Sequence, residues 1–427
     1  MNRKENNSTG WQKGFWSLIA TQFQGAFSDN TLKNLVIFLI LGMGLPPEKR
    51  DTLVPIVGAL FALPFIVFSM LGGWLADHYS KRTVTRAIKL FELGIMGLAS
   101  IGLAMENLPI QLTSVFLMGV HSALFGPSKY GLLPELVPDE KLSWGNGILE
   151  LTTFVAIITG TMTGAILSEH LQGAHAWSGL ILAGLAIVGY FLSGGITHVP
   201  AAAPHKKFHP NFVGELGKQL QTMRKDKGLW LANWGNMWFF FLAAVLQMNL
   251  LVHAKTVLML SDTQNGYLQA AMAIGIGIGS FAAGFLSHNH IEYRLIPAGI
   301  LGMTVAGTIL AWPGLPAIPF CIALSFLGFF GGFFIVPVSA MLQHRPKKSE
   351  KGSILAAANL LSFVGVFLAS GVDYVAAGKF HFHPTKIFMA CAVFMAVTLL
   401  CVLRVYWQVK CNRPEGKTLL AATVKAQ

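Results

Sequence analysis

The first long apolar segment of this chain carries an acid and a base one helical turn apart. Asp29 is about fifteen residues into the segment 14–44, and Lys33 follows on the same helical face. A charge near the middle of a lipid bilayer costs at least a few kcal/mol, so each side chain should face a cavity or a partner. Asn30 and Asn34 add further polar groups. The stretch predicts a binding site for a polar ligand; the alternative is a structural Asp29–Lys33 pair that locks the helix.

A second set of polar residues lies between the fourth and fifth apolar segments. Pro127 is expected to bend the fourth helix just before Lys129. A lysine ammonium suits a phosphate or a carboxylate, although it can also extend to the lipid headgroups. Glu150, with Asn146 one turn before it, is either the counter-ion of Lys129 or a ligand for a cation. Both interpretations are open at this point.

Long apolar helices must position these residues. Charged residues make up 12% of the 427, against roughly 25% in soluble domains, while 53% are hydrophobic and the mean hydropathy is +0.57. So few charges cannot cover a soluble protein of this size. Twelve apolar segments are long enough to cross a membrane, which predicts an all-α membrane protein. They span residues 14–44, 53–75, 83–104, 109–130, 146–168, 174–194, 229–256, 264–287, 294–312, 315–341, 353–376 and 384–406.

The distribution of basic residues predicts the orientation in the membrane. With the N-terminus inside, cytoplasmic segments and helix ends take about 24 of the 31 Lys and Arg residues, as the positive-inside rule requires. An even number of helices then places both termini in the cytoplasm. The net charge of +12 therefore reflects topology, and no nucleic-acid partner is expected.

Similar motifs recur about 210 residues apart, which indicates two related six-helix halves. In this register Gln247, with Asn249 beside it, takes the place of Asp29, and Ser339 takes the place of Lys129. Transporters built from related halves commonly place their site at the interface between the halves. The two halves are therefore expected to share a fold but to contribute unequally to a site.

The segments divide the chain into four regions. Between the halves, apolar residues recur at helical spacing in a basic stretch, which predicts an amphipathic helix that lies either on the inner leaflet or exposed as a linker. The expected regions are an N-terminal six-helix bundle at 1–194, a cytoplasmic linker with this helix at 195–228, a C-terminal six-helix bundle at 229–408, and a cytoplasmic tail at 409–427.

Motifs of catalysis are missing from the sequence. Gly275, Gly277 and Gly279 resemble a dinucleotide fingerprint, but they lie inside an apolar segment and are better explained as close helix packing. No Walker loop, nucleophile elbow or His/Cys cluster is present. We therefore expect no catalytic residue, no cofactor and no metal, and a secondary transporter is favoured over an enzyme.

The loop between the second and third segments resembles the signature of the major facilitator superfamily. Gly73, Leu75, Ala76, Asp77, Tyr79, Lys81 and Arg82 match that signature, whereas His78 and Ser80 depart from it. The resemblance implies a major facilitator fold of twelve transmembrane helices in two pseudo-symmetric bundles. It also implies that Gly73, Asp77 and Arg82 act in gating.

Further blocks resemble the bacterial lysophospholipid transporter family. They are 26–30, 127–131, 146–150, 273–276, 331–337, 342–348 and 359–360. The resemblance implies movement of lysophospholipids, chiefly lysophosphatidylethanolamine, from the outer to the inner leaflet of the bacterial inner membrane. An acyltransferase on another domain or chain, which restores the missing acyl chain, is then the expected partner. Lys33 and Asn34 look like the branch of the family fused to such an acyltransferase.

The polar residues suit a lysophospholipid headgroup. Lys129, with Lys33, would hold the phosphate, and Asp29 or Glu150 would hold the ammonium. The residues expected to contact substrate are Asp29, Asn30, Lys33, Lys129, Asn146, Glu150, Gln247 and Asn249. Two alternatives are a proton-coupled exporter of drugs or small amphiphiles, and a non-transporting membrane subunit that docks an acyltransferase.

Overall fold

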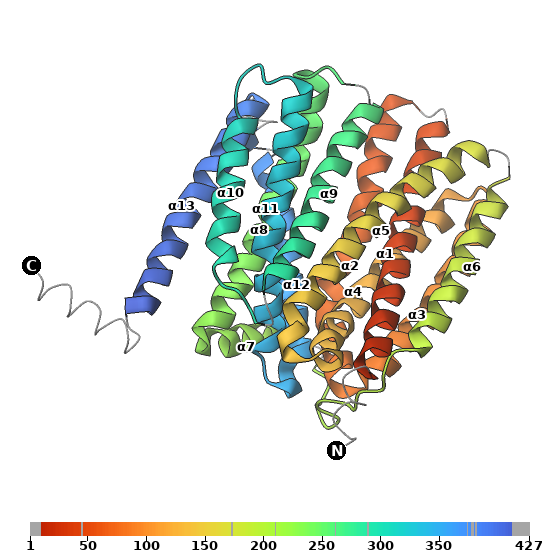
Figure 1. Ribbon diagram of the computed structural model, residues 1–427. Helices are drawn as coiled ribbons and strands as arrows, with labels where there is room; N and C mark the ends of the chain where they lie inside the picture. The colour runs from red at the N-terminus through yellow and green to blue at the C-terminus, as the bar shows by residue number, and fades with distance from the viewer. Residues whose placement is uncertain are drawn as a thin grey trace, which may run out of the picture.

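The computed structural model describes residues 10–411 except 44–45, 172–173, 210, 261, 288–289, 374, 377–379 and 381. This part of the chain contains thirteen α-helices and two 3-10 turns, and no strand (Figure 1). The helices are α1 (Gly10–Gly42), α2 (Pro47–His78), α3 (Lys81–Ala104), α4 (Leu108–Leu136), α5 (Leu142–His170), α6 (His175–Gly194), α7 (Phe212–Lys225), α8 (Lys227–Thr256), α9 (Asp262–Leu286), α10 (Leu295–Leu310), α11 (Ala317–His344), α12 (Lys351–Asp373) and α13 (Pro384–Cys411).

The helices form two bundles of six. Figure 1 shows α1–α6 on the right and α8–α13 on the left, with the short α7 below them. Each of the twelve predicted segments corresponds to one of these long helices, so the predicted all-helical membrane fold is confirmed. Among the described residues, ten helices have the length and hydropathy of membrane spans. The polar stretch 28–34 keeps α1 below that hydropathy, and α10 is shorter than the others.

Glycines allow the long helices to approach closely. A Cβ at Gly275 or Gly279 of α9 would collide with the backbone of α11 at Ser325 or Phe329. Small residues at such positions let two helix backbones meet, which gains dispersion contacts that apolar lipid cannot offer in the same way. The interpretation of this glycine run as helix packing is therefore confirmed.

The two bundles meet at one end of the molecule. We call this the linker end; it is the end where α1 begins, α6 finishes and α7 lies. The ring of Phe65 on α2 stacks on Phe363 of α12 with their centres 4.0 Å apart, and α12 then follows α2 down to the linker end. On the opposite side of the bundle, Gly147 of α5 lies against Ser280 and Gly284 of α9. These pairs close the halves against each other at the linker end.

The amphipathic helix predicted in the linker is α7. Its apolar side chains Phe212, Leu216 and Leu220 pack against the core of the second bundle, and Met223 is fully buried. The bundle itself therefore covers much of the apolar face that had been considered for the lipid surface. At its end, Asp226 caps α8 and binds Arg345, the residue that follows α11, at 2.8 Å. The guanidinium of Arg345 lowers the pKa of this carboxyl below its usual value.

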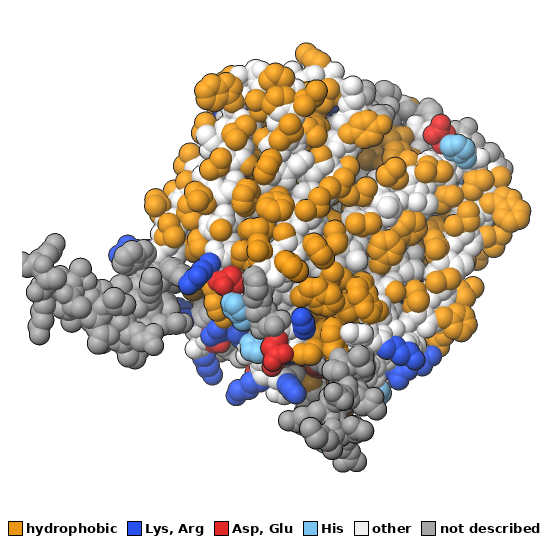
Figure 2. All heavy atoms as spheres, in the orientation of Figure 1, with side chains coloured by type: hydrophobic (Ala, Val, Ile, Leu, Met, Phe, Trp, Pro, Cys, Tyr) orange, Lys and Arg blue, Asp and Glu red, His pale blue; other side chains and the backbone are white. Residues whose placement is uncertain are grey.

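The surface of the molecule has an apolar belt and a basic end. Figure 2 shows hydrophobic side chains over the sides of the bundles, and Lys and Arg side chains gathered at the lower end, near α7. Many of the exposed side chains in the belt are large, such as Phe191 at 73% exposure and Phe285 at 69%. A soluble protein could not expose so many, because each would meet water. The belt therefore fits contact with lipid tails.

Close helix packing can be tested at Gly119 on α4. A Cβ there would overlap the Phe61 carbonyl of α2, whereas a Cβ at Gly58 of α2 meets nothing within 4 Å. Overpacking typically costs about 1–3 kcal/mol. We expect Gly119→Ala to lower the Tm of the purified protein by several degrees and Gly58→Ala to leave it unchanged. Equal thermal shifts for the two variants would show that helix proximity does not limit stability here.

Candidate functional site

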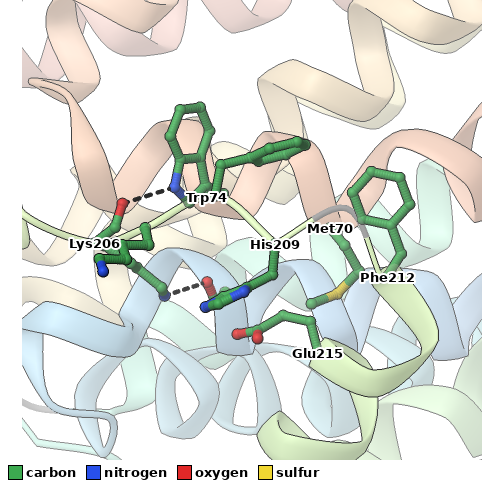
Figure 3. Close-up of a pocket in the computed structure, with 9 residues that line it drawn as sticks. Met70, Trp74, Lys206, His209, Phe212 and Glu215 are labelled. Atoms are coloured by element: carbon green, nitrogen blue, oxygen red, sulfur yellow. Dashed lines mark hydrogen bonds between the residues drawn. The ribbon is translucent and has the colours of Figure 1, made fainter.

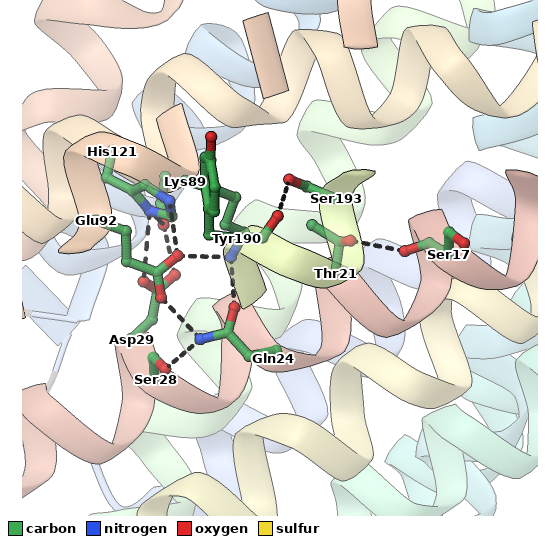
Figure 4. Close-up of polar contacts among 11 residues, drawn as sticks. Ser17, Thr21, Gln24, Ser28, Asp29, Lys89, Glu92, His121, Tyr190 and Ser193 are labelled. Carbon is green, nitrogen blue, oxygen red and sulfur yellow. Dashed lines mark hydrogen bonds and ion pairs between the residues drawn. The ribbon is translucent and has the colours of Figure 1, made fainter. Parts of the chain in front are cut away.

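A buried polar network fills the middle of the first bundle. It is built by α1, α3 and α4, whose labelled side chains converge in Figure 4. The members are Gln24, Ser28 and Asp29 from α1, Lys89 and Glu92 from α3, and His121 and Ser122 from α4. These charges can lie among apolar helices because nearly every one has a partner.

Lys89 and Glu92 form the centre of this network. Lys89 donates to Glu92 Oε2 at 2.6 Å and to Gln24 Oε1 at 2.7 Å, and Gln24 donates in turn to Glu92 Oε1 at 2.9 Å. Lys89 and Glu92 are both fully buried. Their positions three residues apart place both side chains on the inner face of α3. The result is a closed ring of donors and acceptors.

Asp29 lies at the edge of this ring. Ser122 donates to its Oδ2, and the His121 ring lies between two acids, 3.9 Å from Asp29 Oδ1 and 3.3 Å from Glu92 Oε2. Asp29 Oδ1 itself accepts no hydrogen bond. The carboxylate is thus held in place by α4, while one of its buried oxygens has no hydrogen-bond donor within the described residues.

Lys33 does not form the predicted pair with Asp29. Its ammonium instead donates to Asn30 Oδ1 at 3.1 Å and lies over the Phe61 ring, 5.2 Å from the ring centre. Asn34 donates to the Asn30 carbonyl and to Thr161 of α5. The alternative of an Asp29–Lys33 lock is therefore wrong, because the partners of Asp29 come from α4.

Lys129 lies within the membrane-spanning part of α4 without a salt bridge or hydrogen bond among the described residues. Its ammonium lies over the Tyr130 ring, 4.7 Å from the ring centre. The Tyr130 hydroxyl points to Glu150 Oε1 at 3.5 Å. An ammonium in this setting is poised for an anionic ligand, because binding would supply the partner that it lacks.

The other predicted contact residues lie elsewhere. Asn146 of α5 and Gln343 of α11 exchange two amide hydrogen bonds, at 3.1 and 2.7 Å, across the two halves. In the second bundle, Gln247 is exposed and donates to Gln269 at 3.4 Å, and Asn249 is buried and donates to the Pro384 carbonyl at 2.9 Å. The structure does not bring these residues together with Asp29, and their contact with substrate stays a prediction.

Asp77, from the signature loop, connects the two halves. Its buried carboxylate accepts from the backbone N–H groups of Gly352 and Ser353 at 2.7 and 3.1 Å and from the Ser353 hydroxyl at 2.8 Å. These are the first N–H groups of α12, where the helix dipole favours a negative charge. Gly73 lies one turn before Asp77, and a Cβ there would meet the Gly352 carbonyl and the Ser353 Cα at 2.9 Å. The acid of the first half therefore caps a helix of the second.

The cation that pairs with Asp77 comes from the linker. Lys206 donates to Asp77 Oδ2 at 2.8 Å and to the Ser353 hydroxyl at 2.7 Å. Figure 3 shows the same residue held at its carbonyl by the Trp74 indole, at 3.0 Å. Arg82 of the signature donates to the Gly194 carbonyl of α6 at 2.7 Å, inside the first half. Lys206 thus joins α2, the linker and α12 in one contact.

Sequence reasoning missed Gln24, Lys89, Glu92 and Lys206. Lys89 lies within the predicted segment 83–104 and is fully buried. A lysine and a glutamate three residues apart in an apolar segment were a signal that could have been used. Lys206 gave no such signal, because its partner is far away in the sequence.

No group of three or more metal-ligating side chains occurs in the part of the chain that the structure describes. The buried groups are ammonium, carboxylate, amide and imidazole, which suit recognition of a charged headgroup. With two bundles that meet at one end, the arrangement can bind a polar ligand between helices and release it by relative movement of the bundles.

Comparison with known proteins identifies the class. The sequence profile of the Major Facilitator Superfamily matches residues 38–370 and 234–421. The human organic anion transporter MFSD10 (TM-score 0.73, 13% identity, 92% of this chain and 99% of that one) shares the fold. FucP, a transporter of this superfamily solved in the outward conformation, also shares the fold, with a TM-score of 0.72 and 12% identity. The match covers 91% of this chain and 97% of FucP. The chain belongs to the Major Facilitator Superfamily.

Relatives with higher sequence identity indicate the family within this superfamily. The lysophospholipid transporter LplT of Citrobacter koseri is 32% identical over 359 residues, which cover 83% of this chain and 86% of that protein. Two further LplT proteins match in the same way. That of Klebsiella pneumoniae is 31% identical over 372 residues, and that of Escherichia coli O157:H7 is 30% identical over 371 residues. Each match covers 86% of this chain and 89% of the relative. Within the superfamily, the chain is a member of the lysophospholipid transporter family, as the sequence blocks predicted.

The buried ion pair can be tested by removing one or both charges. Breaking a buried pair by removing one partner typically costs about 3–5 kcal/mol, because an uncompensated charge remains. We therefore expect Lys89→Met to lower the Tm and the folded yield strongly, and the double variant Lys89→Met, Glu92→Gln to recover part of the loss. A double variant less stable than Lys89→Met alone would contradict this account.

The Asp77–Lys206 contact can be tested by measuring the separation of the halves at the linker end. Spin labels at Lys141→Cys and Lys347→Cys, in a chain whose native cysteines are replaced by serine, report this distance by pulsed electron resonance. We expect Lys206→Met and Asp77→Asn each to enlarge the population with longer distances, since both remove charge-assisted contacts across the halves.

The control variants for this measurement are Lys207→Met, at the exposed neighbouring position, and Lys206→Arg, which keeps the charge. Both should retain the parent distribution. In an Asp77→Asn background, Lys206→Met should add little, because its acidic partner is already gone. An undiminished effect of Lys206→Met in that background would mean that Lys206 acts without Asp77.

Proposed function

We propose that this chain moves lysophospholipids across the bacterial inner membrane, chiefly lysophosphatidylethanolamine from the outer to the inner leaflet. The observation that carries the proposal is the ammonium of Lys129, which has no salt bridge or hydrogen bond within the described residues and lies over Tyr130, whose hydroxyl donates to Glu150. A zwitterionic phosphate–ammonium headgroup needs one cation and at least one anion, and this part of the first bundle provides both. The relatives described above, which carry the name of lysophospholipid transporter, support the same substrate class.

Different residues of the first bundle would bind the phosphate and the ammonium of the headgroup. Lys129 would hold the phosphate by charge-assisted hydrogen bonds. Glu150, or the free oxygen of Asp29, would accept from the ammonium. His121 and Ser122 would keep the Asp29 carboxylate in position, so that little order has to be created on binding. Lys33, which is partly exposed and already bound to Asn30, would add positive charge near the headgroup.

Movement of the headgroup would follow an alternating-access cycle. The contacts of Asp77 with α12 and of Asn146 with Gln343 hold the halves together at the linker end. These contacts are hydrogen bonds, which can exchange with water when the halves separate, whereas the stacking of Phe65 on Phe363 and the packing of α5 on α9 would also have to be undone. The single acyl tail would remain among lipid tails and the apolar faces of the helices during the crossing.

The orientation and the partner follow from charge and chemistry. Lys and Arg side chains gather at the linker end in Figure 2, so the positive-inside rule would place this end, together with both termini, in the cytoplasm. A lysophospholipid delivered to the inner leaflet lacks one acyl chain. An acyltransferase at the cytoplasmic face, on a separate chain or as a fused domain, would use the product.

Uptake of labelled lysophospholipids into vesicles that contain the purified chain tests the proposal and the division of roles. We expect Lys129→Ala to reduce uptake of both lysophosphatidylethanolamine and lysophosphatidylglycerol at least tenfold, because each has a phosphate. Glu150→Gln should reduce uptake only of the first, whose headgroup has an ammonium. Lys225→Ala, at an exposed position of α7, is the matched control and should transport normally.

Two results would contradict the proposal in different ways. A wild-type protein that moves no lysophospholipid but exports cationic dyes against a proton gradient would favour the drug exporter considered above. Normal uptake by both Lys129→Ala and Glu150→Gln would be consistent with lysophospholipid transport, but it would show that these two residues do not bind the headgroup.

A further inference from the structure

An open groove of about 300 Å³ lies on the outside of the first bundle, at the linker end between α3 and α6. Arg82, Arg86 and Leu90 of α3 line one side of it. Tyr190 of α6 and His198, just beyond that helix, line the other. The groove is separate from the buried network, and the proposed transport function does not use it.

The two arginines keep binding capacity that the protein does not use. Arg82 donates one N–H to the Gly194 carbonyl at 2.7 Å. Arg86 donates one to the Tyr190 hydroxyl at 3.2 Å and lies over that ring at 5.3 Å. Each guanidinium has five N–H donors, and within the described residues Arg82 and Arg86 each give one of them to a protein acceptor. The donors that remain on the terminal nitrogens can bind an acceptor in the groove that meets both guanidinium groups.

The position of the groove along α3 indicates an amphiphilic ligand. The helix begins at Lys81, so Arg82 and Arg86 lie in its first two turns, at the depth of the lipid headgroups. One turn further, Leu90 is 56% exposed, and Phe191 on α6 is 73% exposed. A phosphate at the arginines would therefore continue into acyl chains that lie along the apolar surface of α3 and α6.

The charges of the groove select among phospholipids. It is lined by two guanidinium groups and one imidazole, and none of the residues that line it is acidic. A zwitterionic headgroup would place its ammonium beside these basic groups, where no carboxylate lines the groove to bind it. A headgroup with net negative charge has no such unfavourable contact. Guanidinium groups also match the geometry of phosphate by paired N–H donors.

We propose that this groove binds an anionic phospholipid of the leaflet at the linker end, with its phosphate held by Arg82 and Arg86. The lipid occupies the outer surface of the first bundle and is distinct from the lysophospholipid that the chain transports. Tyr190 orients Arg86 through its hydroxyl and ring, and Arg82 is fixed by the end of α6.

Native mass spectrometry of the full chain in detergent, titrated with phosphatidylglycerol, tests this site. We expect Arg86→Gln to weaken the first binding event about tenfold, because a charge-assisted contact to phosphate is lost. Ala87→Trp, at an exposed position in the same groove, should weaken it as much by filling the space without changing the charge. Arg224→Gln removes an equal charge from the exposed face of α7 and should leave the affinity within about twofold.

The pattern of results decides between a built site and general attraction. If Arg224→Gln weakens binding as much as Arg86→Gln, or if Ala87→Trp binds like the wild type, the lipid follows the net charge of the surface and the proposal is wrong. Because Ala87→Trp keeps every charge and alters an exposed residue, it decides the question even if Arg86→Gln folds poorly.

Two further titrations identify the source of the phosphate. Phosphatidylcholine should bind the first site much more weakly than phosphatidylglycerol; equal binding would overturn the argument from charge. Inorganic phosphate at millimolar concentration should not displace phosphatidylglycerol. Displacement would show that the arginines bind a free anion and that the apolar surface of α3 and α6 contributes nothing.

Discussion

A charge among apolar helices must find a partner, because neither lipid nor side chains of Leu and Phe can solvate it. The first bundle shows how completely this constraint is met. Lys89, Glu92 and Gln24 satisfy one another in a closed ring, and His121 extends the ring to Asp29. Once these groups are paired, α1, α3 and α4 are fixed relative to one another. The bundle can then hold the few groups that lack partners, which are the ones available to a ligand.

The contact between the halves also pairs a buried charge, but with hydrogen bonds that can break and form again. The Asp77 carboxylate is buried, but its partners are the first N–H groups of α12 and the side chains of Ser353 and Lys206. Each of them would be at the protein surface once the halves separate, so water can replace every bond. A core of large apolar side chains at this place would hold the halves more permanently. Polar contact therefore suits a joint that has to open and close.

The two bundles share a fold and differ in chemistry. The core of the second bundle is built mainly by Leu, Ile, Val, Met and Ala side chains, with phenylalanines such as Phe239 stacked on Phe334 and with α9 close to α11 at Gly279. Its counterpart of Asp29, Gln247, is exposed and bound to Gln269. Among the described residues, the buried charges of the membrane-spanning helices therefore lie mainly in the first bundle, whereas the second buries mainly apolar side chains and amides.

The sequence by itself determined the class of the molecule. Twelve apolar segments, few charges, a repeat and the signature at 73–82 predicted the two bundles and the family, because hydropathy and helix length depend on local composition. It also identified Asp29, Lys129 and Glu150 as unusual, since a charge in an apolar segment is visible without a structure.

Only the tertiary structure decided which of these charges are satisfied. Asp29 and Lys33 are one turn apart on α1, yet Asp29 binds residues of α4 and Lys33 binds Asn30. Lys206 reaches Asp77 and Ser353 from a distant part of the chain. Such pairings depend on how helices face one another, and helical periodicity fixes the face of a residue but not the helix that lies opposite. That Lys129 has no salt bridge or hydrogen bond within the described residues is a finding of the same kind, because its potential partners had to be placed first.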